Sequence, residues 1–317
     1  MVLNFLSIFA LFYRNFQSQS KITIKYTILI KLKVMEVKQL MKKVFFAPFT
    51  RLIVGFFVLM LIMILVPSVM RNMMNGSKLM QIVGTLVFVG ISLGTYALLF
   101  RYYEHRKITE LSFSGFGKKV FTGFGIGFLL ISIVAVVMLV LGVYHIDGVN
   151  YNQLIWYYLV MAMSAGVIEE LLLRGVVFRL VEEKLGTTLA LLISAFIFGF
   201  MHIINPNASI WASIAISIEA GILLGAAYAM TRNLWFPICI HWAWNFTEGY
   251  IYGFAISGGA TNNSLFVGSL SGPGWLTGGA FGAEASVVTV LVCSLASTWF
   301  LWRTWQKKNW IFTYWHF

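Results

Sequence analysis

Two adjacent carboxylates and a guanidinium interrupt a long apolar stretch of the chain: Glu169, Glu170 and Arg174. Residues 154–167 before them and residues 176–178 after them are almost wholly apolar. Because each charge at mid-bilayer costs about 2.5–3.5 kcal/mol on insertion scales, such groups usually have a partner and a function. On a helix Glu170 and Arg174 are i and i+4, so we expect them to pair. Glu169 then points about 100° away, free to face a cavity. A structural ion pair near the membrane surface would explain these three residues equally well.

Two histidines lie within later apolar segments, each four residues from a second side chain that shares its helix face. Phe198 precedes His202, and Asn245 follows His241. A carboxylate and a neutral imidazole can hold and deprotonate a water. An imidazole and an amide can donate hydrogen bonds to a developing oxyanion. Either histidine alone is more often a buried structural residue, but the whole set is suited to hydrolysing an amide within the membrane.

The composition predicts a polytopic all-α membrane protein. Of its 317 residues, 59% are hydrophobic and only 11% are charged, and the long uninterrupted apolar runs exclude a barrel of alternating strands. The net charge of +12 comes from Lys and Arg between the apolar runs, which favours contact with lipid headgroups over nucleic acid. Cys239 and Cys293 lie inside apolar runs, so we expect two small buried residues and no disulfide.

Eight membrane-spanning helices are expected, enclosing an intramembrane polar cavity. They are Leu52–Met70, Met80–Leu99, Phe121–Tyr144, a span from Leu154 into the Glu-Glu segment, Thr188–Ile204, Ile210–Met230, Leu234–Ile256 and Val287–Trp302. Lys and Arg concentrate in alternate connections, which predicts that both termini are cytoplasmic. Residues 257–283 form a long, uncharged, Gly- and Ser-rich connection.

Three segments follow from this pattern. Residues 1–50 are a basic N-terminal segment, residues 51–303 are the eight-helix membrane domain, and residues 304–317 are a cytoplasmic tail. Residues 1–34 contain an apolar run too short to span a membrane, and we expect Met35 to be the physiological start.

Three motifs occur in order: Glu-Glu-x-x-x-Arg (169, 170, 174), Phe-x-x-x-His (198, 202) and His-x-x-x-Asn (241, 245). Their order and spacing resemble the signature of the CPBP family, over about residues 150–250. That family comprises the type II CAAX prenyl endopeptidases and the bacteriocin-processing or self-immunity proteins, which are regarded as intramembrane glutamic proteases. Any one motif is weak evidence, but three in order, each on an expected span, are specific.

The resemblance implies an intramembrane glutamic endopeptidase whose catalytic residues are Glu169, His202, His241 and Asn245. Glu169 would activate water with help from His202, and His241 with Asn245 would form the oxyanion hole. Supporting roles would fall to Glu170, Arg174 and Phe198. The family mechanism is regarded as metal-free, so no cofactor is expected. Two histidines and a glutamate also match a catalytic zinc ligand set, so a divalent metal on Glu169, His202 and His241 stays an alternative.

Two further acidic residues lie in expected spans without a family role. Glu219 is in the middle of its span, where it would be protonated or paired with a polar group. Glu248 is seven residues after His241, on the same helix face, where it could orient the last motif or sit in a polar vestibule.

Several functions share this set of residues. The leading hypothesis is an endopeptidase; the alternative is a non-catalytic binding, immunity or regulatory protein that uses the same cavity. A secondary transporter would show internal repeats, and none is evident. The expected partners are membrane lipid and a peptide or membrane-protein substrate, with a prenylated CAAX peptide and a leader peptide both compatible. We expect an integral protein of a bacterial plasma membrane.

Overall fold

A computed structural model describes residue 29 and residues 31–151, 154–261 and 263–313. The chain forms two compact units, Met1–Arg51 and Leu52–Phe317. In the first unit, residues 31–45 are helical. The apolar run at the start of the chain and most of the segment before the expected start lie outside the described residues.

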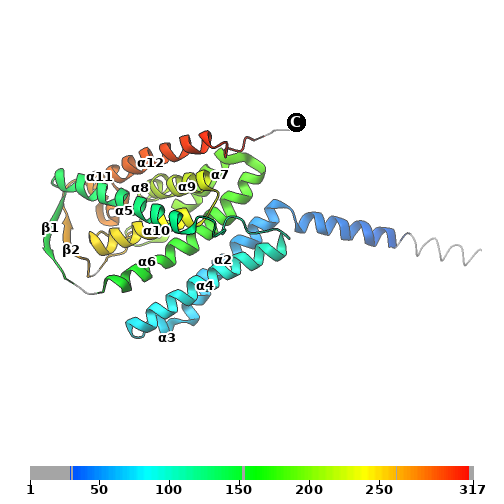
Figure 1. Ribbon diagram of the computed structural model, residues 1–317, viewed down its shortest axis with the longest axis horizontal. Coiled ribbons are helices and arrows are strands. Elements are labelled where there is room, and N and C mark those ends of the chain that lie inside the picture. Colours follow the sequence, from blue (N-terminus) through cyan, green and yellow to red (C-terminus); the bar gives the residue numbers. More distant parts are fainter. Residues whose placement is uncertain (1–28, 30, 152–153, 262, 314–317) are drawn as a thin grey trace, which may run out of the picture. The chain divides into compact units, whose positions relative to one another are not determined.

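The second unit is built from helices with few other elements (Figure 1). The longer helices are α2 (Pro48–Val69), α4 (Lys78–Tyr103), α5 (Phe116–Val140), α6 (Ile155–Glu170), α7 (Arg179–Met201), α9 (Leu223–Thr231), α10 (Trp235–Phe246) and α12 (Val287–Gln306). The short ones are α3 (Arg71–Met74), α8 (Ile210–Ile216) and α11 (Gly274–Thr277). Three π-helical segments, Leu171–Phe178, Ser217–Ile222 and Thr247–Ile251, follow α6, α8 and α10 directly. Turns of 3₁₀ helix occur at His202–Ile204, Gly279–Phe281 and Ala283–Ala285.

Six helical segments of the described chain are long and apolar enough to cross a membrane, so the expected count of eight is not confirmed. The fourth and fifth expected spans form one helical segment, Ile155–Ile204. Its backbone leaves the helical conformation at Gly186, with φ 75° and ψ 172°. The seventh expected span corresponds to α10 and its π-helical extension, which ends at Ile251. This helical segment is shorter than the about 20 residues that a membrane span needs.

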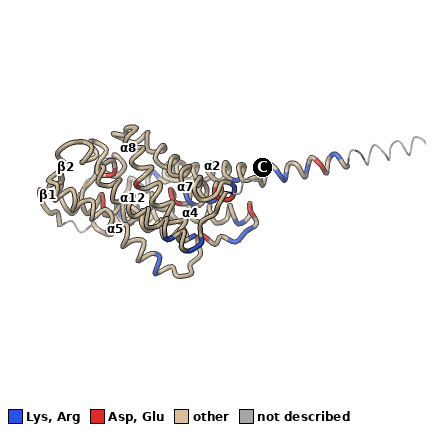
Figure 2. Tube along the Cα trace, turned by 90° about the horizontal axis from the view of Figure 1, so that it is seen from above, with Lys and Arg blue, Asp and Glu red and all other residues tan. Residues whose placement is uncertain are grey.

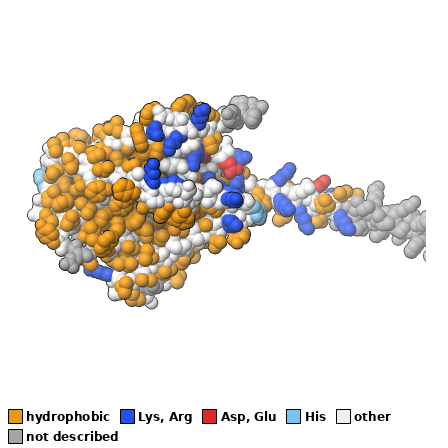
Figure 3. All heavy atoms as spheres, in the orientation of Figure 1, with side chains coloured by type: hydrophobic (Ala, Val, Ile, Leu, Met, Phe, Trp, Pro, Cys, Tyr) orange, Lys and Arg blue, Asp and Glu red, His pale blue; other side chains and the backbone are white. Residues whose placement is uncertain are grey.

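The apolar surface of these helices identifies an integral membrane protein. Only 11% of the span in α2 is buried within the protein, and large side chains such as Phe121, Phe196 and Leu295 are exposed. Figure 3 shows hydrophobic side chains over most of the visible surface of the helical unit. In Figure 2 most Lys and Arg of this unit lie toward the end away from the β-strands. This arrangement is typical of a protein whose apolar girdle faces lipid.

Close helix packing brings α10 against α5 and α6 at the centre of the unit (Figure 1). Glycines on α5 permit this approach: a Cβ at Gly127 would lie 2.2 Å from the carbonyl oxygen of Ile240, and one at Gly123 would lie 2.8 Å from that of Phe236. Small residues at helix interfaces serve the same purpose in membrane proteins generally. α10, which carries the last motif, is therefore held firmly against its neighbours.

A two-stranded antiparallel sheet was not expected from the sequence. β1 (Tyr144–Val149) pairs with β2 (Phe266–Leu270), with an irregularity in register between Ile146 and Gly148. β2 lies within the long connection expected to be a loop. The Tyr144 hydroxyl donates a hydrogen bond to the carbonyl of Tyr252, 2.8 Å away. This sheet joins the connections before α6 and after α10 at one end of the unit.

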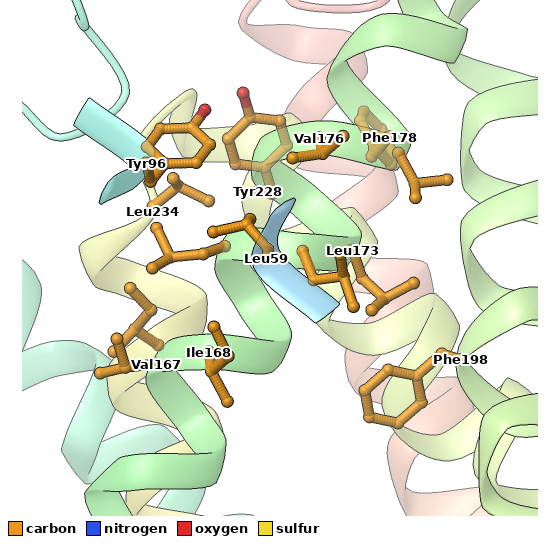
Figure 4. Close-up of a cluster of buried hydrophobic side chains, with 14 of the residues drawn as sticks. Leu59, Tyr96, Val167, Ile168, Leu173, Val176, Phe178, Phe198, Tyr228 and Leu234 are labelled. Atoms are coloured by element: carbon orange, nitrogen blue, oxygen red, sulfur yellow. The ribbon is translucent and has the colours of Figure 1, made fainter. Parts of the chain in front are cut away.

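Buried apolar residues fix the first motif in place (Figure 4). Val167, Ile168 and Leu173 flank the charged residues in sequence and belong to one core cluster with Phe198 and Tyr228. The motif is thus anchored by its own neighbours on the helix. Cys239 and Cys293 are both buried and free, as expected.

Candidate active site

The first motif spans the junction between α6 and the π-helical segment Leu171–Phe178. Glu170 and Arg174 are fully buried, and Arg174 Nη1 lies 2.8 Å from Glu170 Oε1. The pairing expected from their spacing is confirmed. π-Helical turns are rare and are frequent at functional sites, and this one begins directly after the two glutamates.

Arg174 also connects the first motif to the second. Its Nη2 donates to the carbonyls of Ala220 (3.0 Å) and Gly221 (2.8 Å). Its guanidinium carbon lies 5.0 Å from the centroid of the Phe198 ring, within cation–π range. The guanidinium therefore holds α6, the helix segment between the second and third motifs, and Phe198 together.

His241 lies between the two glutamates. Its Nδ1 is 3.1 Å from Glu170 Oε1, and its Nε2 is 3.9 Å from Glu169 Oε2. Because Glu170 is a carboxylate paired with Arg174, Nδ1 is the donor in this contact. The Nε2–Glu169 separation is too long for a direct hydrogen bond. His241 thus joins the third motif to the first, although 71 residues separate it from Glu170.

The tautomer of His202 follows from its surroundings. Its Nδ1 lies 2.7 Å from the carbonyl oxygen of Phe198, and a carbonyl can only accept, so Nδ1 carries the hydrogen. In the neutral ring Nε2 is then the basic nitrogen. The Phe198 ring lies 4.8 Å from the His202 ring and 6.0 Å from the His241 ring, between centroids, and so spaces the two imidazoles.

A small cavity of about 20 Å³ lies beside these groups, and its lining includes His202, His241 and Asn245. That volume suffices for about one water. Glu169 is not among the described residues that line it. Glu170 rather than Glu169 turns inward because it has two donors there, Arg174 and His241. The Glu169 side chain is partly exposed, at 17%.

A larger groove of about 470 Å³ lies between α6 and the end of α10 with its π-helical extension, and the connection that follows also lines it. Its lining is mainly apolar and aromatic, and it includes Tyr157, Tyr158, Met161, Phe246 and Tyr250. The volume is in the range of ligand-binding pockets. Asn245 lines both the groove and the small cavity, so the groove ends at the third motif.

Three acidic residues outside the motifs also belong to this region. Glu219 and Glu284 line the small cavity, and Glu248 is fully buried nearby. The sequence raised Glu219 and Glu248 without assigning a role. It gave no role to Glu284. The one feature of the sequence that could have drawn attention to Glu284 is its position as a lone acidic residue just before the last apolar run.

The expected site residues thus form one connected group, with Glu169 reaching it through His241. Among the described residues, no group of three or more His, Cys, Asp or Glu is arranged to hold a metal ion.

Comparison with known proteins bears on residues 151–247. This stretch matches the family model described as Type II CAAX prenyl endopeptidase Rce1-like. The matched residues contain all three motifs, and the match agrees with the family that those motifs resemble. No curated protein and no solved structure matches the chain.

Proposed function

We propose that this membrane protein, whose residues 151–247 match the Rce1-like type II CAAX prenyl endopeptidases, is an intramembrane glutamic endopeptidase. The observation that carries the proposal is the meeting of the three motifs. His241 contacts Glu170 and approaches Glu169, and it shares a cavity with His202 and Asn245. Packing alone does not require two histidines, an amide and two carboxylates at one place.

The attacking water would lose its proton to Glu169, and His202 would assist this step. The Glu169 carboxylate is an acceptor, and His202 offers Nε2 because its Nδ1 donates to Phe198. Water oxygen then bonds to the carbonyl carbon of the substrate. The captured proton passes to the peptide nitrogen when the C–N bond breaks. General bases of this kind contribute about 10²–10⁴-fold to rate.

His241 and Asn245 would stabilise the oxyanion. His241 uses Nδ1 to donate to Glu170, so its donation to an oxyanion comes from Nε2 and requires both ring nitrogens to carry hydrogen. Glu170, itself held by Arg174, supplies the counter-charge. Asn245 adds an amide N–H at the border of cavity and groove. Loss of one such donor typically costs about 10²–10³-fold in kcat.

The groove between α6 and α10 is our candidate for the substrate path. Its aromatic and apolar lining suits a substrate with a lipid or apolar chain, such as a prenylated CAAX peptide. A leader peptide with an apolar segment would also fit. We place the protein in a bacterial plasma membrane, and the distribution of its Lys and Arg favours both termini in the cytoplasm.

The alternative is a binding, immunity or regulatory protein that uses the same cavity without turnover. The two readings differ in what Glu169→Gln does. This change keeps the side-chain volume and removes the base, so it abolishes turnover by an endopeptidase but leaves binding of a partner largely intact.

The test uses the purified full-length protein in lipid nanodiscs and a fluorogenic farnesylated CAAX peptide. Wild type is compared with Glu169→Gln and with Glu183→Gln, which removes an exposed carboxylate on α7. We expect Glu169→Gln to lose at least about 10²-fold in kcat and Glu183→Gln to match wild type. Repeating the assay with a chelator tests the metal alternative. Equal activity in wild type and Glu169→Gln, at matched protein levels, contradicts the assignment.

A further inference from the structure

A second set of buried carboxylates lies at or beside the small cavity, outside the three motifs. Glu219 is 1% exposed, Glu248 is 0% exposed and Glu284 is 4% exposed. They come from three separate elements: the π-helical segments Ser217–Ile222 and Thr247–Ile251, and the turn Ala283–Ala285. Buried charges are costly without partners, so the contacts of each carboxylate decide its protonation.

Glu284 is placed to act on the catalytic histidines. It lines the same cavity as His202 and His241 and interacts electrostatically with both. Its Oε2 accepts the backbone N–H of Ser257 at 2.6 Å. The N–H comes from a residue with φ 48°, a conformation that is uncommon for a non-glycine residue. The turn itself is held by Trp211, whose indole N–H donates to the carbonyl of Ala285 at 2.8 Å.

Glu248 completes the arrangement. The indole N–H of Trp244 donates to its Oε2 at 3.1 Å, while its Oε1 has no donor among the described residues. Its carboxyl group lies beside that of Glu284. Two ionised carboxylates can only accept, so this contact forms only when one of them carries a proton.

The donors indicate which carboxyl group is ionised. Burial raises the pKa of both carboxyl groups, but only Glu284 accepts a short backbone N–H and faces the histidines across the cavity, and both favour its charged form over that of Glu248. Glu248 is then the acid, and its O–H donates to Glu284. This assignment also satisfies Glu248 Oε1, which is otherwise without a donor.

We propose that Glu284 is a positioning residue of the catalytic site: a buried carboxylate, held by the acid form of Glu248 and by Ser257 N–H, that is the counter-ion of the His202 imidazolium. This inference rests on the proposed function. Glu169 takes the proton of the attacking water, and the proton then passes to His202 Nε2, where an N–H bond forms. The imidazolium is stabilised by Glu284 until that proton passes to the leaving nitrogen. Glu248 keeps its proton and Glu284 its charge throughout the cycle.

Other ionisable groups at this place do not replace Glu284. The Cys293 thiol lies 4.0 Å from Glu219 Oε2, at the limit of a hydrogen bond. Glu219 Oε1 has no donor among the described residues, which is the condition of a neutral carboxylic acid. Glu169 and Glu170 interact with His241, and Arg174 is paired with Glu170.

The kinetic test compares Glu284→Gln with Glu248→Gln in the nanodisc assay, with Glu183→Gln as the control for loss of a carboxylate. Removing the counter-ion should lower kcat about 10²-fold and change KM less than about threefold. Glutamine at position 248 retains a neutral donor, so Glu248→Gln should lose less than about fivefold. Equal losses in the two variants would indicate a structural role and overturn the proposal. A severe loss in Glu248→Gln with a mild one in Glu284→Gln would show that Glu248 carries the charge. That result would also overturn the proposal.

Infrared spectroscopy tests the shared proton without turnover. The carbonyl stretch of a buried carboxylic acid should lose one component in Glu248→Gln and keep it in Glu284→Gln. The reverse pattern, or no loss in either variant, overturns the assignment.

If wild type cleaves no peptide at all, the proposed function fails and the counter-ion role fails with it. The infrared spectra still decide which carboxyl group of the pair is protonated. If wild type cleaves and only Glu284→Gln behaves otherwise than expected, the counter-ion role alone is wrong.

Discussion

Replacing Arg174 by Ala should destabilise the protein severely, because the change leaves Glu170 as a buried charge. Both side chains are fully buried, and the guanidinium makes hydrogen bonds to Glu170 and to the carbonyls of Ala220 and Gly221. Removing one partner of a buried ion pair costs about 3–5 kcal/mol. Each carbonyl that loses its donor adds to the cost. His241 Nδ1 continues to donate to Glu170 and recovers part of the loss.

We therefore expect about 4 kcal/mol, or a change of about 10³-fold in the unfolding equilibrium. This is a large share of the total stability of a typical protein, about 5–15 kcal/mol, so the yield of folded protein should also fall. The measurement is the free energy of unfolding of the purified protein in mixed micelles, with Arg101→Ala as control. Arg101 is an exposed residue on α4, where substitutions usually change stability by less than about 0.5 kcal/mol.

A double variant separates the stranded charge from the lost packing. With Glu170→Gln added to Arg174→Ala, no carboxylate is left unpaired, so the double variant should be more stable than Arg174→Ala alone by about 2 kcal/mol. Two results would refute the reasoning: an Arg174→Ala protein within about 1 kcal/mol of wild type, or a double variant whose loss equals the sum of the single losses.

Three further predictions test other parts of the account. Asn245→Ala should lower kcat by about 10²–10³-fold with little change in KM; an unchanged kcat would remove this residue from the oxyanion hole. Burial raises the pKa of Glu104, but hydrogen bonds and charge from Arg179 and Arg106 outweigh it and hold the pKa below its ordinary value of 4.5. This group stabilises the fold above pH 4.5, and its contribution is lost as the pH falls through the lower folded-state pKa. Thermal melts should thus show more acid destabilisation in wild type than in Glu104→Gln, and equal losses would count against the ion pairs. Gly199→Ala should destabilise by about 1–3 kcal/mol, because its Cβ would lie 2.2 Å from a neighbouring backbone oxygen; Gly94→Ala, where the space is open, should be silent, and equal melting temperatures would contradict the close approach.

Local spacing predicted the parts of the site that depend on one helix. The Glu170–Arg174 pair follows from i,i+4 geometry alone, and it is present at 2.8 Å. The contact of His202 with Phe198 also links i and i+4, although the acceptor is the backbone carbonyl rather than the ring. The resemblance to a family added which of these residues act together.

Long-range contacts could not be derived from spacing. Glu284 reaches the cavity from a turn far along the chain from either histidine, and no periodic pattern connects them. The inward position of Glu170 depends on a histidine that lies 71 residues away. The turn at Gly186 joins two expected spans into one helical segment, because glycine adopts this conformation without a steric penalty. The strands β1 and β2 lie in two connections, and the residues that pair between them are more than 100 positions apart in the sequence.

The measurement that tests the central claim most directly is proteomics of protein termini in host membranes that contain wild type or Glu169→Gln. Both forms should be present at equal levels, with Glu183→Gln as a third sample. We expect termini that appear with wild type and Glu183→Gln and are absent with Glu169→Gln, together with an uncleaved precursor that accumulates. Identical termini in all three samples, with a partner that co-purifies equally with each, would show that the cavity binds without cleaving and would contradict the account.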